Sequence, residues 1–257
     1  MDHRFSLFEK YCLPSIANQT SKNFEWIVLF DSRTPEQNKD WIVDLQSKCT
    51  QLILVFVEPE NGRYFAEIFK KEVVKRLNHI DNLNEKKRVL TTYLDNDDAL
   101  NVRFVEDVQQ RAKELSDGTF INCTEGYQFY TDHNYLMQIH YPRNHFVSVV
   151  ESDDPADVKT IYGFGSHYYI DRIPGVTIEH VANCPLWCEV IHEKNMGNDA
   201  YFLWGTKMMW ESNLLRRDFA LEETVQSGVG LYFFRFMPRY IKTFIRRTKY
   251  YLFSRKW

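Results

Sequence analysis

The feature that most constrains this chain is a cluster of acidic residues, Asp95-Asn96-Asp97-Asp98. It directly follows the run Arg88–Leu94, whose β-branched and apolar residues predict a buried strand that ends there. Three carboxylates at one strand end repel one another and lose hydration if they are even partly buried. The fold must therefore either offset the repulsion with a cation or hydrogen bonds, or keep the cluster in water.

Two interpretations of the cluster follow from these residues. Oxygen ligands suit Mg²⁺ or Mn²⁺, and ligands of α/β sheets bind outside the carboxyl ends of the strands, which favours a metal–diphosphate site. Alternatively, the cluster is a solvated turn in which Asp98 or Asn101 caps the next helix. An EF-hand calcium loop does not fit, because Ala99 and Leu100 stand where it needs an oxygen ligand and a glycine.

Length and cysteine content indicate the broad class of protein. A chain of 257 residues can bury one sizeable core, which predicts one domain with an appendage. The five cysteines are odd in number and lie mostly in apolar stretches, as expected for reduced thiols in a cytoplasm. The first residues lack the pattern of a signal peptide, and no run of roughly 18 apolar residues occurs. We therefore expect a cytoplasmic protein.

Charge is distributed unevenly along the chain. The formal net charge is −3, and residues 231–257 hold eight Lys and Arg residues without an acidic one. The preceding 230 residues therefore carry a net charge of −11, which is −3 minus +8. A body this acidic repels phosphate backbones, so we expect no nucleic-acid partner.

The basic tail has the pattern of an amphipathic helix. One helical face carries Ile241, Phe244, Ile245, Thr248 and Leu252, and the opposite face carries Arg239, Lys242, Arg246 and Lys249. This pattern predicts a helix that lies on an anionic membrane, here the inner face of a bacterial membrane. The alternative is a helix docked on the acidic body of the same chain.

The first 115 residues alternate between helix and strand patterns. Continuous apolar runs predict strands buried on both faces, and apolar residues at helical spacing predict helices. In order we expect a helix over 5–18 bent near Pro14, a strand over 24–31, a helix capped by Thr34 and Gln37, a strand over 52–57, a helix over 65–77, the strand over 88–94 and a helix over 105–115. This alternation predicts an α/β fold with a mixed, mostly parallel sheet flanked by helices.

The second half of the chain changes character. Short, aromatic-rich strand patterns cover 119–131, 135–141 and 146–150, separated by polar turns. Such a division fits a nucleotide-binding half joined to an acceptor-binding half. We divide the chain into a domain over 1–215, with a donor half over 1–118 and an acceptor half over 119–215, and a basic aromatic helical tail over 216–257.

Seven short stretches occur in an order that is typical of one enzyme family. They are Leu7–Ile16, Gln19-Thr20, Phe24–Asp31, Thr34-Pro35-Glu36, Leu94–Leu100, Arg143–Glu151 and Trp187–Asn195. Together they resemble the putative rhamnosyl transferase family, bacterial enzymes related to the inverting glycosyltransferases of family 2. The resemblance covers roughly residues 4 to 200 and implies a GT-A fold, the α/β fold of nucleotide-diphospho-sugar transferases.

The sequence departs from that family in two places. A GT-A sheet opens with a strand ahead of the first helix, whereas this sequence begins almost within the helix; either the start is misplaced, the sequence is trimmed, or the sheet lacks one edge of its donor pocket. The family also has an arginine shortly before the acidic cluster, where this chain has Tyr93.

We assign expected donor and metal roles to six residues. Asp97 is the expected metal ligand, and His192 resembles the late histidine that completes the metal shell in several GT-A enzymes. Asp95 is expected to reach the ribose or a metal-bound water, with Asp98 in support. Asp31 matches where related enzymes hold the nucleobase, although it could equally initiate a turn. Arg63 could contact the diphosphate or lie exposed at a helix start.

An inverting transfer also needs a carboxylate that deprotonates the acceptor hydroxyl. Glu151 is the first choice and Asp153 the second, because they end an apolar strand and begin an acidic loop; Asp154 and Glu189 are alternatives. A different metal site is conceivable if Cys184, Cys188 and His192 share a helical face as zinc ligands.

The expected function is a metal-dependent inverting glycosyltransferase that uses Mg²⁺ or Mn²⁺. It would move a sugar, rhamnose by the family's name, from a dTDP- or UDP-linked donor to a glycan or lipid-linked acceptor. One alternative is a sugar-nucleotide nucleotidyltransferase, which needs a glycine-rich basic loop that the sequence lacks. Another is a non-catalytic relative that binds a glycan or docks at a membrane.

Overall fold

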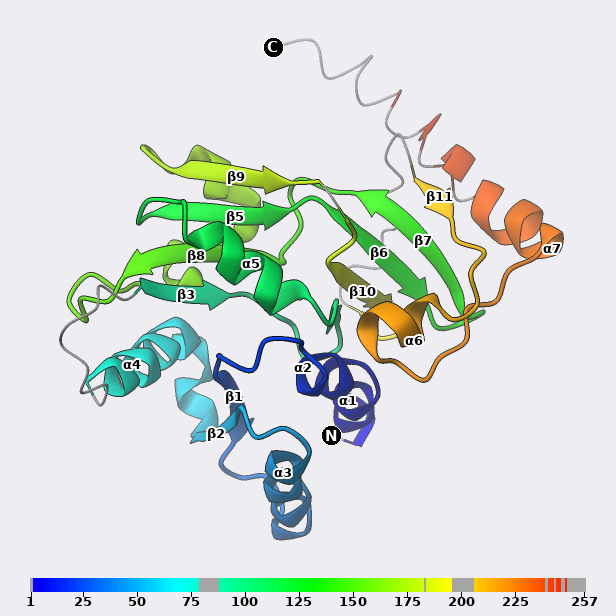
Figure 1. Ribbon diagram of the computed structural model, residues 1–257. Helices are drawn as coiled ribbons and strands as arrows, with labels where there is room; N and C mark the ends of the chain where they lie inside the picture. Colours follow the sequence, from blue (N-terminus) through cyan, green and yellow to red (C-terminus); the bar gives the residue numbers. More distant parts are fainter. Residues whose placement is uncertain are drawn as a thin grey trace.

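The fold is a mixed α/β arrangement of three sheets and flanking helices (Figure 1). The computed structural model describes residues 2–78, 88–182, 184–195 and 206–238, together with 240–242, 244–245 and 248. Within this part of the chain, the strand orders are β1-β2, β3-β8-β5-β9 and β11-β7-β6-β10-β4. The largest hydrophobic cluster joins the N-terminal helix to the inner faces of these sheets.

The N-terminal helix is continuous but bulged ahead of Pro14. It consists of α1 (Asp2–Leu7), a π-helical turn (Phe8–Cys12) and α2 (Leu13–Ala17). The bulge lies where the proline ring would meet the carbonyl of an ordinary α-helix, so it relieves the clash without breaking the helix. The expected bend near Pro14 is thus a π-bulge.

The next elements form a small parallel unit. They are β1 (Trp26–Asp31), α3 (Glu36–Lys48), β2 (Leu52–Val57), a 3₁₀ turn (Pro59–Tyr64) and α4 (Phe65–Leu77). β1 pairs in parallel with β2, with Trp26 opposite Leu52.

Two sequence predictions are wrong in this unit. Pro35, not Thr34, precedes α3, since the Thr34 hydroxyl donates to the Asp31 carbonyl instead. β1 is also not buried on both faces, because only Phe30 in it is fully buried.

The remaining strands form two mixed sheets. Their bounds are β3 (Arg88–Thr92), β4 (Ala99–Leu100), β5 (Thr119–Cys123), β6 (Glu125–Tyr130), β7 (Tyr135–His140), β8 (Val147–Ser152), β9 (Thr177–Val181), β10 (Trp187–Ile191) and β11 (Lys207–Met208). The described strands form three parallel pairs and five antiparallel pairs. A mixed sheet is confirmed, but the prediction of mostly parallel pairing is wrong, because the second half contributes hairpin and returning strands.

Further helices pack against the sheets. α5 (Phe104–Ala112) packs through Phe104, Val108 and Ala112, and two 3₁₀ turns (Ile161–Phe164 and His167–Arg172) follow β8. α6 (Leu214–Phe219) belongs to a second hydrophobic cluster that extends to Val225. The expected boundary at residue 215 therefore lies inside α6, and the chain packs on the body beyond it.

The described part of the tail begins as α7 (Val229–Leu231) and a π-helical turn (Tyr232–Phe236). Ile241, Phe244 and Ile245 of the expected apolar face are exposed. Leu252, Arg239, Arg246 and Lys249 lie outside the described residues. No described helix has the length and apolar character needed to cross a membrane.

The β6–β10 contact supplies a stability prediction. A Cβ atom added at Gly126 of β6 would overlap the indole ring of Trp187, which is fully buried, whereas one added at Gly62 would meet nothing within 4 Å. We expect Gly126→Ala to lower the free energy of unfolding by about 2 kcal/mol or more, because the core cannot expand cheaply.

Urea denaturation of both variants measures this difference. Gly62→Ala is the matched control and should stay within about 0.5 kcal/mol of the parent. Equal stabilities for the two variants would contradict the packing described.

Candidate functional site

The acidic cluster forms a loop that is held between the N-terminal helix and β10. The Asp98 backbone N–H donates to the Asp95 carbonyl over 3.4 Å, which closes a tight turn. β4 then follows at once and pairs antiparallel with β10, with Ala99 opposite Cys188. On the other side, the backbone N–H of Leu100 donates to the Ser15 hydroxyl. The loop therefore occupies a fixed position at the carboxyl end of β3.

Asp98 is the buried anchor of this loop. Its Oδ1 accepts the backbone N–H of Val190 over 2.8 Å, and its Oδ2 lies 2.8 Å from Nε2 of His145. The Asp98 side chain is only 4 % exposed and that of His145 is 15 % exposed. His145 precedes β8, so this carboxylate joins three segments that are distant in sequence.

The Asp98–His145 pair is an ion pair at neutral pH. Burial alone would lower the pKa of His145, but the hydrogen bond to Asp98 and its charge raise that pKa to about 9. Burial raises the pKa of Asp98 to about 7, against the lowering by His145. His145 and Asp98 compete for one proton, and the imidazole of His145 holds it because its pKa is the higher of the two.

A neighbouring histidine, His167, is instead neutral. The rings of His145 and His167 lie 5.7 Å apart. Burial and, next, the positive charge of His145 lower the pKa of His167 to about 4. The site thus places one cationic and one neutral imidazole beside Tyr93, whose ring contacts both.

Asp97 forms a second carboxylate–histidine pair. Nε2 of His192 lies 3.0 Å from Asp97 Oδ2, so the structure brings together the two residues expected as metal ligands. The Lys194 backbone N–H donates to Nδ1 of His192 over 3.2 Å. That bond assigns the ring proton to Nε2, which then donates to Asp97. In this tautomer His192 orients Asp97, and a metal would have to displace the proton.

Asp95 is the most exposed carboxylate of the loop, with 49 % of its side chain accessible. Its Oδ2 lies 3.7 Å from His145 Nε2. The partial burial of Asp95 raises its pKa; the His145 charge lowers it, and the Asp97 charge raises it further. Asp95, Asp98 and His145 have potential ligand atoms within 4.8 Å of one another.

The donor set fits a hard divalent cation through oxygen atoms. Both oxygens of Asp98 are already engaged, and the proton on His145 blocks its nitrogen as a ligand. Asp95 and Asp97 keep accessible oxygens, since 49 % of the Asp95 side chain and 25 % of the Asp97 side chain are exposed. Oxygen ligands on a partly exposed loop suit Mg²⁺ or Mn²⁺ with further oxygens from diphosphate and water. The residues present therefore fit the expected metal.

The four candidate base carboxylates occupy two different places. Glu151 lies opposite Val89, near the amino end of β3, and accepts the backbone N–H groups of Lys159 and Thr160. From Val89 to Thr92 alone, β3 moves about 10 Å toward the acidic loop. Asp153 and Asp154 follow Glu151 at that far end. The structure therefore does not bring these three together with the acidic loop.

Glu189 does lie beside the loop. It is on β10, next to Val190, and its Oε2 accepts the Gln128 side-chain amide over 2.6 Å. Its charge reaches both Asp98 and His145, where it favours the protonated forms. It is half-buried and so keeps access to solvent.

The two remaining donor candidates sit at the same edge of the molecule. Asp31 ends β1, and its Oδ1 accepts the backbone N–H of Arg33 in the turn considered as the alternative. Arg63 follows β2 and packs on the Tyr64 ring, with 4.7 Å between the guanidinium carbon and the ring centroid. Neither arrangement includes a direct contact with the acidic loop among the described residues.

The zinc alternative is wrong in its geometry. Residues 187–191 form a strand instead of a helix, so Cys184, Cys188 and His192 do not share a helical face. Cys188 is buried and Cys184 is exposed.

Sequence reasoning missed the histidines at 145 and 167. Spacing gave no signal for either, because His145 meets Asp98 across 47 residues of chain. The family resemblance did contain a signal for His145, because this residue lies in the stretch Arg143–Glu151 that supports the resemblance.

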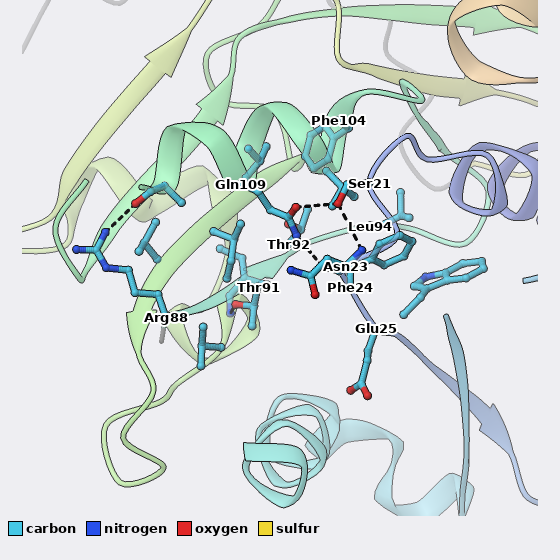
Figure 2. Close-up of a pocket in the computed structure, with 18 of the residues that line it drawn as sticks. Ser21, Asn23, Phe24, Glu25, Arg88, Thr91, Thr92, Leu94, Phe104 and Gln109 are labelled. Atoms are coloured by element: carbon cyan, nitrogen blue, oxygen red, sulfur yellow. Dashed lines mark hydrogen bonds between the residues drawn. The ribbon is translucent and has the colours of Figure 1, made fainter. Parts of the chain in front are cut away.

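A large cavity lies beside the acidic loop, and no residue of the loop lines it. It has a volume of about 1490 Å³ and lies between β1 and β3, with Leu94 the lining residue nearest in sequence to the cluster. Figure 2 shows its labelled walls, including Phe24, Thr92 and Phe104.

Comparison with known proteins identifies the family. The model of the putative rhamnosyl transferase family matches residues 1–201. This span is more than half of the 257 residues, so the chain belongs to the putative rhamnosyl transferase family, as the ordered stretches predicted. No curated protein matches the chain, and neither does a solved structure. The matched span contains the acidic loop, His145 and His192.

The buried ion pair supplies a pH prediction. The pKa of His145 is raised from 6.5 to about 9 in the folded state, so its stabilisation is fully present below pH 6.5 and is lost as the pH rises through 9. We expect Asp98→Asn in metal-free buffer to bring the pKa of His145 below 6.5, because burial then dominates. The free energy of unfolding at pH 7 should fall by about 3 kcal/mol.

NMR titration of the imidazole C–H signals follows this change. Asp171→Asn, at an exposed acid paired with Arg143, is the control and should leave the pKa of His145 as it is. A value that stays near 9 in Asp98→Asn would contradict the ion pair.

Proposed function

We propose that this protein is a metal-dependent, inverting glycosyltransferase with a GT-A arrangement, which uses Mg²⁺ or Mn²⁺ and a nucleotide-diphosphate sugar. The observation that carries the proposal is the acidic loop at the carboxyl end of β3, where Asp95 and Asp97 keep accessible oxygens between two histidines. Membership of a rhamnosyl transferase family supports it, and rhamnose is the sugar that this membership favours.

Asp97 and Asp95 would hold the cation through oxygen. When bound, the cation neutralises the charge that develops on the nucleoside diphosphate leaving group. His192, expected from sequence as a ligand, instead directs Asp97 by donating to its Oδ2 over 3.0 Å. Asp98 stays inside the protein and fixes the loop through Val190 and His145.

His145 balances the charge of the site. Four carboxylates (Asp95, Asp97, Asp98 and Glu189) surround one imidazolium, with Arg4 acting on Asp95 from the N-terminal helix. The excess negative charge favours a divalent cation over an anion at this loop. The same imidazolium keeps Asp98 ionised, so that it continues to accept both of its hydrogen bonds.

Glu189 is the base that we propose for the acceptor hydroxyl. It replaces Glu151 and Asp153 in this role because it lies beside Val190 at the loop, whereas those two lie toward the other end of β3. Gln128 holds one Glu189 oxygen, which leaves the second for the acceptor proton. Deprotonation on the side opposite the leaving diphosphate would invert the anomeric centre.

Asp31 and Arg63 are proposed donor contacts at the neighbouring strand ends. Asp31 has one oxygen outside its turn hydrogen bond, which suits an N–H of the thymine or uracil base of a dTDP- or UDP-linked donor. Arg63 follows β2 at the same edge, where its guanidinium can pair with phosphate oxygens. The acceptor would be a glycan or a lipid-linked saccharide.

A transfer assay tests the function. We expect release of nucleoside diphosphate from dTDP-rhamnose or a UDP-sugar that requires Mn²⁺ or Mg²⁺. Asp97→Asn should lower kcat/KM at least about 100-fold, since the protein then loses one of the two carboxylates that would hold the cation. Glu189→Gln should lower kcat about 100-fold or more with little change in the donor KM.

Asp44→Asn, on the exposed side of α3, is the matched carboxylate control and should keep full activity. A large loss in Glu151→Gln with Glu189→Gln unaffected would overturn the assignment of the base. Absence of donor turnover under all metal conditions would favour the non-catalytic alternative.

We also propose that the tail region docks at an anionic membrane surface on the cytoplasmic side. Several large apolar side chains there are exposed to solvent, namely Val229, Phe233, Phe234, Ile241, Phe244 and Ile245. Residues 231–257 carry eight Lys and Arg residues, so charge adds to apolar insertion. Such a location suits an enzyme that acts on lipid-linked acceptors.

Vesicle co-sedimentation tests this docking. The chain should bind phosphatidylglycerol vesicles in preference to phosphatidylcholine vesicles, and Phe233→Ser with Phe234→Ser should weaken binding at least about tenfold. Val43→Ser removes an exposed apolar residue from α3 and should have no effect. Equal binding to both lipids would contradict an electrostatic contribution.

A further inference from the structure

A small cavity of about 130 Å³ lies at the carboxyl ends of β5 and β9, and no residue of the acidic loop lines it. Asn122 and His180, the next-to-last residues of these strands, stand opposite each other in the sheet and both line the cavity. Val147, the first residue of β8, lines it as well. β3 runs in the same direction as β5, because both pair antiparallel with β8 (Figure 1). The cavity and the acidic loop therefore lie at the same edge of one sheet, where α/β proteins bind their ligands.

The polar part of the cavity wall is held in place by buried amides. The Asn144 side-chain amide donates to Asn122 Oδ1 over 2.9 Å and to the Tyr141 carbonyl over 2.7 Å. The Asn122 amide in turn donates to the Pro142 carbonyl. These bonds fix the turn ahead of β8 against the end of β5, so little ordering is needed when a ligand binds. An amide oxygen has two lone pairs, so Asn122 Oδ1 can also accept a hydroxyl group.

The rest of the wall is apolar, and the charges beside it are balanced. Ile170 and Ile178 line the cavity and belong to one hydrophobic cluster. The Arg143 guanidinium donates to Asp171 Oδ2 over 2.7 Å, and both residues line the cavity. A negatively charged ligand would have to compete with Asp171 for Arg143, and the neutral His167 offers it no charge. The cavity therefore suits a neutral ligand that combines hydroxyl groups with an apolar face.

His167 is a wall that the cavity shares with the candidate functional site. It lines the cavity, and its ring lies 5.7 Å from that of His145 and 6.2 Å from that of Tyr93. His145 pairs with Asp98, and the charge of Glu189 reaches it. A ligand in the cavity is thus separated from the groups around the proposed base by a single imidazole ring. This arrangement suits two successive units of one saccharide chain, one on each side of His167.

The volume limits how much of a saccharide the cavity holds. A space of 130 Å³ corresponds to about four water molecules at about 30 Å³ each. A single pyranose ring fills such a space with some of its hydroxyl groups left outside, and a second ring does not fit.

We propose that this cavity binds one neutral pyranose unit of the glycan acceptor, the unit next to the one that receives the transferred sugar. The inference rests on the proposed function, because it takes the ligand to be the acceptor of that reaction. Tyr168 and Tyr169 follow His167 directly, and their exposed rings give further units of the same glycan a surface to pack on.

Titration of the full chain with methyl glycosides, without donor or metal, tests the cavity. The probes are the methyl glycosides of glucose, galactose and rhamnose, with that of glucuronic acid as the acidic comparison. NMR of the His167 imidazole C–H signals is the readout. We expect at least one neutral glycoside to shift these signals saturably, with a dissociation constant at least about tenfold below that of the glucuronide. No saturable shift with any neutral glycoside, or equal or tighter binding of the glucuronide, would overturn the proposal.

Three variants separate the cavity from other surfaces. His180→Trp places a larger ring at the exposed end of β9 and should weaken binding of the neutral glycoside at least about tenfold. His133→Trp, in the turn between β6 and β7, is the matched control and should retain it. Asp171→Asn removes the partner of Arg143 and should tighten glucuronide binding roughly threefold. Binding that persists in His180→Trp, or a glucuronide affinity that ignores Asp171→Asn, would contradict the site.

Donor binding is measured on the same samples, so that this inference and the proposed function can fail separately. A chain that binds dTDP or UDP with Mn²⁺ while no neutral glycoside shifts His167 would overturn the inference and leave the proposed function standing. A chain that binds a neutral glycoside at His167, yet neither binds nor turns over a donor, would support the cavity as a saccharide site and contradict the transfer reaction instead.

Discussion

The carboxylate of Asp98 is the interaction on which the site depends. It is buried, and it ties the loop after β3 to the backbone of β10 and to the imidazolium before β8. Burying a charge is unfavourable unless it is paired and hydrogen-bonded, and here both conditions hold. With one carboxylate satisfied internally, the loop can present the other two outward.

That arrangement resolves the repulsion implied by the acidic cluster. The charge of Asp98 is paired with that of His145, and Asp97 accepts a hydrogen bond from Nε2 of His192, so neither carboxylate lacks a partner. Asp95 accepts a hydrogen bond from Tyr93, lies 3.7 Å from His145 and keeps about half of its side chain accessible. The site is therefore assembled but remains electronegative, which is the condition in which a divalent cation and a diphosphate bind together.

Local patterns in the sequence predicted the elements well. The apolar run 52–57 is β2 with the same bounds, because a continuous apolar run of this length has few alternatives; the expected burial is wrong, since only Leu52 of the strand is fully buried. The position of the acidic loop at a strand end was also correct. The start of α3 was misplaced by local competition, since Thr34 donates to Asp31 and so does not cap the helix.

Non-local features were not predictable in the same way. The pairing of β3 with β8 joins segments about 60 residues apart and moves Glu151 away from the loop, and no periodicity reports such a pairing. The Asp98–His145 contact is equally remote in sequence. The burial expected for β1 was wrong, because a run of apolar residues does not report what packs against the two faces of a strand, and only Phe30 of β1 is fully buried.

The measurement that tests the central claim most directly is Mn²⁺ binding followed by electron paramagnetic resonance, with and without dTDP or UDP. The account predicts that one nucleoside diphosphate tightens Mn²⁺ binding at least about tenfold, and that Asp97→Asn removes this effect while Asp44→Asn retains it. Mn²⁺ binding that is indifferent to both nucleotides, or that survives in Asp97→Asn, would contradict a metal–diphosphate site at the acidic loop.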